Sequence, residues 1–187
     1  MVVDAAVAES LRGSKQVRID LFVASCTERM AELFTGLRYG DDARAEDVDL
    51  YLEILDELWN PSLTGNVFAA RVEVVEALSE LQPSEEELLD VADIYAFYAV
   101  LCLRYALLTR ANGEPEDAVR CAHACLTALG QLDRNIPQGA FFESEHESQR
   151  RFLLDDVSSG ESLLRLRKSD RDASRERLLA VNSRLQA

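Results

Sequence analysis

The chain has 187 residues, 48% of them hydrophobic, which suits one globular domain that buries its own core without disulfides. Its 34 acidic residues outweigh 20 basic ones, and the net charge of −14 argues against binding to nucleic acid or to anionic membranes, both of which attract cationic side chains. We therefore expect no nucleic-acid partner and no membrane partner, whereas a basic protein partner is electrostatically allowed.

The charge is unevenly placed. Residues 1–147 carry 28 acidic and 11 basic side chains, a net charge of −17, and residues 148–187 carry 6 acidic and 9 basic ones, a net charge of +3. The apolar run Ala96–Leu103 stops at Arg104, short of a membrane span. The first residues include Asp4 and Glu9 with no early basic residue, unlike a secretory signal. We expect a cytoplasmic protein.

The chain reads as helices separated by short glycine and proline breaks, with no strand signal. The predicted helices cover residues 3–11, 16–36, 45–59, 65–81, 85–111, 115–132 and 143–185, the last breaking or bending near Gly160. This order predicts an all-α, up-and-down-like helical bundle of about six to eight helices. We expect residues 1–187 to form a single domain. The charged C-terminal helices, at about 143–187, either belong to its bundle or form an extension that packs on it.

Two of these helices have a predicted place in the bundle. Helix 85–111 is the most apolar, with a capping box of Ser84 and Glu87 at its start, and we expect it at the centre. The stretch Arg167–Arg184 alternates charges of opposite sign, which is typical of a solvated helix.

The tightest group of soft ligands is Cys121-Ala-His123-Ala-Cys125. Cysteines four apart share one helical face, but His123 points away from it. A zinc site normally needs four converging ligands, which Cys26 and Cys102 could complete. Buried free cysteines are more often small core residues, so we predict no metal and no cofactor.

The segment Glu143-Ser-Glu145-His146 resembles half of a di-iron carboxylate site, because a glutamate precedes a histidine by three residues. The second half is missing, since the only other histidine is His123 and no glutamate precedes it at that spacing. We predict a charged face at a helix start instead.

Glu28 and Arg29 interrupt an otherwise apolar helix, where they can face solvent or pair with another helix. A group of aromatic residues can form either a plain core or a cleft for a small ligand. Its members are Trp59, Tyr95, Phe97, Tyr98 and Tyr105.

No catalytic motif is present: the sequence has no glycine-rich phosphate loop, no G-x-S-x-G and no H-E-x-x-H. With two histidines, acid–base chemistry would depend on carboxylates, and no pair of carboxylates stands out. We assign no catalytic residue and lean away from an enzyme.

The order of several short motifs resembles the uncharacterised bacterial YjaG-like family over roughly residues 15–180. These motifs are Phe22-x-x-x-Cys26-x-Glu28-Arg29-Met30, Gly40-Asp41, Leu58-Trp59 and Asp93-Ile94-Tyr95-x-x-Tyr98-Ala99. The chain lacks the prolines that family members usually carry soon after E-R and after the second tyrosine. The resemblance implies a compact α-helical fold and a bacterial origin, and it implies no activity.

Three functions follow as hypotheses. The leading one is a non-catalytic interaction protein, an inhibitor or immunity-like binder of a basic partner. The second is a ligand-binding protein or enzyme with a helix-lined cleft around the candidate binding residues Glu28, Arg29, Asp93, Tyr95 and Tyr98. The third is a self-associating structural protein, a homodimer formed through the C-terminal helices.

Overall fold

The computed structural model describes residues 3–82, 90–136, 139–155, 157 and 159–186. Their α-helices are α1 (Ala5–Gly13), α2 (Gln16–Met30), α3 (Glu32–Thr35), α4 (Ala45–Leu58), α5 (Gly65–Glu76), α6 (Val91–Asn112), α7 (Pro115–Asn135), α8 (Phe141–Leu154) and α9 (Gly160–Leu185). Single 3-10 turns lie at η1 (Asp42–Arg44) and η2 (Ser79–Leu81). With one-turn α3 counted as the end of α2, the described residues form eight helices and no strand, which confirms the all-α bundle of six to eight helices.

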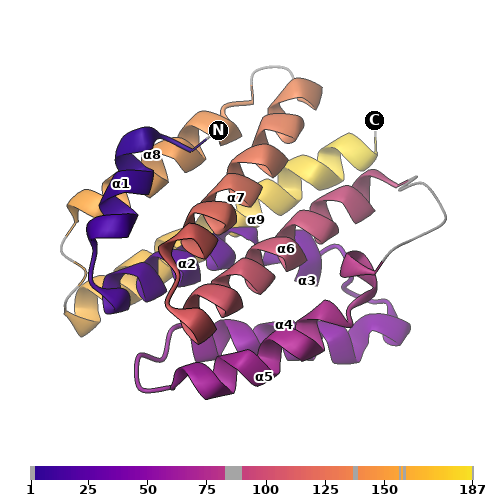
Figure 1. Ribbon diagram of the computed structural model, residues 1–187. Helices are drawn as coiled ribbons and strands as arrows, with labels where there is room; N and C mark the ends of the chain where they lie inside the picture. Colours follow the sequence, from indigo (N-terminus) through magenta and orange to yellow (C-terminus); the bar gives the residue numbers. More distant parts are fainter. Residues whose placement is uncertain (1–2, 83–89, 137–138, 156, 158, 187) are drawn as a thin grey trace.

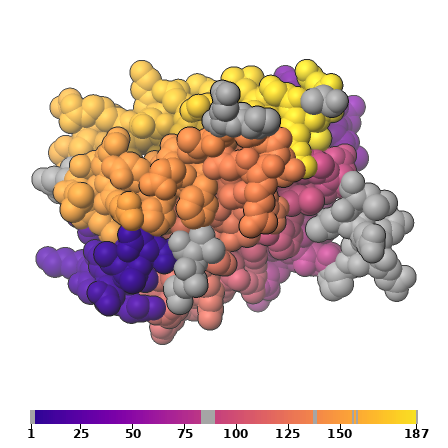
Figure 2. Space-filling model, turned by 90° about the horizontal axis from the view of Figure 1, so that it is seen from above, coloured from indigo at the N-terminus to yellow at the C-terminus, as the bar shows by residue number. Residues whose placement is uncertain are grey.

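Helix α6 lies in the middle of the bundle, packed against α2, α5 and α7 (Figure 1). Helices α4 and α5 lie along one side of the molecule, while α1 and α8 lie at the other (Figure 1). Helix α9 packs lengthwise on α2 and α3. Seen from above, α7, α8 and α9 form one continuous face (Figure 2).

The central position predicted for the apolar helix is therefore confirmed, but its start differs. Asp90 caps it by accepting a hydrogen bond from the Ala92 N–H at 2.9 Å, whereas the predicted capping box of Ser84 and Glu87 lies outside the described residues. By length and composition alone α6 could cross a membrane, which the sequence analysis did not expect. Its packing against three other helices is that of a core helix.

The apolar stripe of α2 and α3 forms the centre of the core, as its three- and four-residue spacing predicts. Seven residues of this stripe are buried: Ile19, Phe22, Val23, Cys26, Met30, Leu33 and Phe34. Phe34 stacks on Tyr51 with ring centroids 5.1 Å apart, which ties α3 to α4. Phe22 meets Phe152 edge-on at 5.4 Å, which ties α2 to α8.

The prediction that the end of the chain is a solvated helix is wrong for one face of α9. Asp170, Ser174, Arg177 and Val181 are all buried against the bundle, at steps of four, three and four residues. Charged side chains can be buried when opposite charges meet them, and alternating signs in sequence do not reveal whether they do. The predicted break near Gly160 is confirmed, because α8 ends at Leu154 and α9 starts at Gly160.

Replacing Gly113 with Ala tests the turn between α6 and α7. Gly113 has φ 71°, a left-handed conformation that costs an alanine about 1 kcal/mol. We expect Gly113→Ala to lower the free energy of unfolding by that amount in urea denaturation. Gly13→Ala is the control, because Gly13 ends a helix with nothing within 4 Å of an added Cβ. Equal destabilisation by both changes would contradict this account.

Candidate functional site

Arg29 is buried, although it is charged, and its side chain joins three helices. Its Nε and Nη2 donate to Glu145 Oε2 and Oε1 of α8, both at 2.8 Å. Its Nη1 donates to Asp170 Oδ1 of α9 at 3.0 Å. The bidentate pair with Glu145 matches the planar guanidinium group and fixes its orientation.

Arg177 of α9 completes the group. Its Nη2 donates to Glu145 Oε2 at 2.7 Å, and its Nη1 donates to the Arg29 carbonyl oxygen at 3.0 Å. Ser25 Oγ donates to Asp170 Oδ2 at 2.7 Å and accepts from Arg29 Nη1 at 2.6 Å. Gln149 Nε2 donates to Glu145 Oε1 at 2.8 Å. We call these six residues the buried charge network.

The buried charge network contains two guanidinium groups and two carboxylates, so its ionised form is neutral. Burial alone would raise the pKa of Glu145, but Arg29 and Arg177 lower it to about 2. Burial raises the pKa of Asp170, and Arg29 only partly opposes that effect. Every member is at most 4% exposed, so a substrate cannot reach the charges. The arrangement suits a clamp that holds α2, α8 and α9 together.

Glu28 faces a different set of partners from its neighbour Arg29. Its carboxylate accepts from Trp59 Nε1 at 2.7 Å, Arg171 Nε at 2.7 Å and Arg167 Nε at 3.0 Å. It borders a cleft of about 280 Å³ between α2, α4 and α9 whose lining is mostly charged. Its described lining residues offer polar contacts but no nucleophile held by a base.

The other three predicted binding residues lie elsewhere. Asp93 accepts from Arg38 Nη2 at 2.7 Å, the Tyr95 hydroxyl accepts from Arg184 at 3.0 Å, and the Tyr98 hydroxyl accepts from Gln131 at 3.3 Å. Tyr95 borders a pocket between α6, α7 and α9, away from the cleft beside Glu28. The structure therefore does not bring the five candidates into one cleft.

Sequence reasoning missed the partners of Arg29. Asp170 and Arg177 share a face with Ser174 and Val181, a spacing that could have marked α9 as packed on one side. Glu145 was considered as part of a di-iron motif, but in the structure its carboxylate is occupied by two arginines. Beside it, Glu143 is exposed and His146 stacks on Phe142 with ring centroids 5.9 Å apart.

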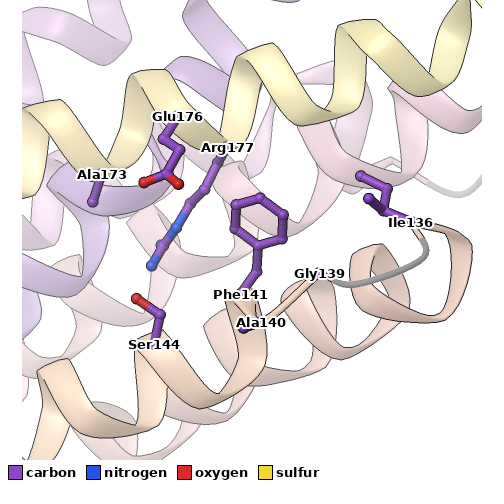
Figure 3. Close-up of a pocket in the computed structure, with 8 residues that line it drawn as sticks. All are labelled: Ile136, Gly139, Ala140, Phe141, Ser144, Ala173, Glu176 and Arg177. Carbon is purple, nitrogen blue, oxygen red and sulfur yellow. The ribbon is translucent and has the colours of Figure 1, made fainter.

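A second cleft, of about 470 Å³, lies between the start of α8 and the middle of α9. Figure 3 shows Phe141 and Ser144 on the α8 side, with Arg177 and Glu176 reaching toward them from α9. Arg177 is thus the member of the buried charge network that borders this cleft. Its guanidinium is already engaged by Glu145 and the Arg29 carbonyl, so the described lining of the cleft offers no free cation to an anionic ligand.

The outer face of α4 is a row of acidic side chains. Glu46, Asp49, Glu53 and Asp56 are exposed and recur at steps of three and four residues, so they line one side of α4. Asp42, also exposed, lies in the η1 turn just before the helix. Glu53 pairs with Arg71 and Asp56 with Arg167, whereas the other three form no ion pair within the described part of the chain. We call these five residues the acidic face.

The four cysteines are the residues that could hold a metal. The Sγ atoms of Cys26, Cys121 and Cys125 lie within 4.8 Å of one another, and Cys102 Sγ lies 3.4 Å from Cys125 Sγ. All four are buried and reduced. Sequence spacing placed only Cys121 and Cys125 together, and the packing of α2, α6 and α7 brings in the other two.

Comparison of the chain with models of protein families, with curated proteins and with solved structures finds no match. The resemblance to the YjaG-like family stays a prediction.

Replacing Arg29 with Met tests whether the buried charge network holds the fold. The change leaves Asp170 without its ion-pair partner and Glu145 with only one, and removing one partner of a buried pair costs about 3 kcal/mol or more. We expect a matching fall in the free energy of unfolding in urea. Arg12→Met is the control, because its pair with Glu116 is exposed and should leave the urea midpoint almost unchanged. Similar midpoints for both variants would refute the clamp.

The pH dependence of stability tests Glu145. Because its folded pKa of about 2 lies below its ordinary value of 4.5, its contribution is complete above that value and is lost as the pH falls toward 2. We expect Glu145→Gln to be less stable than wild type at neutral pH and to lose less stability between about pH 5 and about pH 2. Glu147→Gln, exposed on the same helix, should keep the wild-type profile. Parallel profiles for Glu145→Gln and wild type in a pH series of urea melts would contradict the assignment.

Proposed function

We propose that this chain is a non-catalytic interaction protein that binds a basic protein partner through the acidic face of α4. The observation that supports the proposal is the row of four exposed carboxylates on one side of that helix, together with exposed Asp42 in the turn before it. Three of the five, Asp42, Glu46 and Asp49, have no ion-pair partner among the described residues, so they are available to cations of another molecule.

The surroundings of the acidic face also suit a protein partner. Leu52 is 45% exposed beside it, and Tyr39 is 89% exposed just before it in sequence. Interfaces commonly combine an apolar or aromatic anchor with a charged rim. The net charge of −14 would attract a cationic partner over longer range and speed its association at low salt.

The internal charges strengthen this interpretation. The buried charge network is neutral when ionised, so the excess negative charge lies at or near the surface. Among the described residues that line the clefts next to Glu28 and Arg177, no nucleophile is paired with a base, which favours binding over catalysis. An inhibitor or immunity-like protein that masks a cationic surface fits these features.

Reversing two charges tests the proposal. The tagged wild-type chain is used to capture partners from a lysate of its source, and captured proteins are identified and measured at several salt concentrations. We expect a stoichiometric partner of basic composition whose capture weakens as salt rises. Glu46→Lys combined with Asp49→Lys should lower the partner's affinity about tenfold or more.

A matched control separates the acidic face from net charge alone. Glu9→Lys combined with Glu143→Lys makes the same change in net charge on the exposed surfaces of α1 and α8 and should bind nearly as well as wild type. An equal loss of affinity in both double variants would mean that net charge, and not the acidic face, determines binding. A chain that captures only itself at a defined mass would favour the homodimer instead.

A further inference from the structure

All four cysteines of the chain meet at one place in the core. Cys26 comes from α2, Cys102 from α6, and Cys121 and Cys125 from successive turns of α7. Each is 0% exposed. Small core residues placed only to fill space would be spread through the bundle, as the buried alanines are on α1, α2, α6 and α7. The cysteines instead converge from three helices on one point.

The distances between the sulfur atoms are close to those of a metal–thiolate centre. A metal–sulfur bond of about 2.3 Å places neighbouring sulfur ligands roughly 3.8 Å apart. The Sγ atoms of Cys26, Cys121 and Cys125 all lie within 4.8 Å of one another, and small side-chain rotations would close the difference. His123, by contrast, is exposed on the opposite side of α7 and cannot join them.

We propose that Cys26, Cys121 and Cys125 bind one soft monovalent metal ion, Cu(I). Every donor atom is sulfur, and soft thiolates select soft ions such as Cu(I) or Zn(II) over harder ones. Cys102, whose Sγ lies beside that of Cys125, borders the site. This site is independent of the acidic face and of any partner.

Coordination number favours Cu(I) over Zn(II). Structural Zn(II) sites almost always have four protein ligands, whereas only three cysteine sulfurs among the described residues, those of Cys26, Cys121 and Cys125, all lie within 4.8 Å of one another. Three thiolates with Cu(I) carry a net charge of −2, which a nearby cation must offset. The cation at hand is Arg29, whose Nη2 lies 3.4 Å from Cys26 Sγ. Arg29 also pairs with Glu145 and Asp170, so it offsets this charge in part.

The site would hold its ion rather than use it to activate water. It is closed on all sides, so no coordination position is open to solvent or substrate. Cysteine thiols bind metal ions as thiolates, so an ion that binds here displaces their protons to solvent. Binding should therefore weaken as the pH falls.

The test is a competition for Cu(I). The full chain, reduced and kept free of oxygen, is titrated with Cu(I) against a chromophoric Cu(I) chelator, and its unfolding temperature is followed in parallel. We expect one ion per chain, affinity that falls with pH, and a higher unfolding temperature when the ion is bound. Cys121→Ala combined with Cys125→Ala should lose all three effects, whereas Cys102→Ala, equally buried, should keep them.

Four results would overturn the proposal: no competition with the chelator, retention of the ion by the α7 double variant, loss of the ion in Cys102→Ala alone, or binding of Zn(II) in preference to Cu(I). If the double variant does not fold, X-ray absorption of the copper-loaded wild type decides. A shell of sulfur alone at the copper supports the site, and nitrogen or oxygen ligands refute it.

Discussion

The ion pair between Arg29 and Glu145 is the contact on which the arrangement of the C-terminal helices depends. A guanidinium in the last turn of α2 can be buried only if carboxylates meet it. Glu145 and Asp170 supply them, and they follow Arg29 in sequence by 116 and 141 residues. Arg177 then offsets the remaining charge. Each charge in the buried charge network stays paired only when the other helices are in place. The network therefore holds α8 and α9 in one register on α2, and the positively charged end of the chain becomes part of the bundle.

Glu28 and Arg29, adjacent in sequence, hold α9 from two sides. Neighbouring residues on a helix point about 100° apart, so Glu28 meets Arg167 and Arg171 at the edge of the bundle while Arg29 reaches its partners inside. The interface between α2 and α9 is thus largely polar. Buried ion pairs add limited net stability compared with apolar packing, but they reject wrong registers, because a shifted helix would leave charges unpaired. Charge, more than apolar area, positions α9.

The buried charge network, the cysteine cluster and the acidic face occupy three different parts of the molecule. The buried charge network is internally balanced, the four cysteines lie in the core between α2, α6 and α7, and the acidic face of α4 lies outside. Arg29 links the first two, because it donates to Glu145 and also lies beside Cys26. The excess negative charge remains on the surface, where a partner can meet it. The two proposals, a basic protein partner and a Cu(I) ion, therefore concern different groups and can be tested separately.

Helical periodicity is a local property, and for that reason the sequence alone determined the all-α class, most helix positions, the central apolar helix and the buried stripe of α2. It also located Glu28 and Arg29 as unusual charges and Cys121 and Cys125 as neighbours on one face. Only the tertiary structure decided what these residues meet. Asp93, Tyr95 and Tyr98 form hydrogen bonds with other residues and do not lie beside Glu28 and Arg29. Glu145 and Asp170, from distant helices, pair with Arg29, and Cys26 and Cys102 lie beside the cysteines of α7. The partner of a buried charge or thiol is set by how whole helices pack, and no spacing within one segment contains that information.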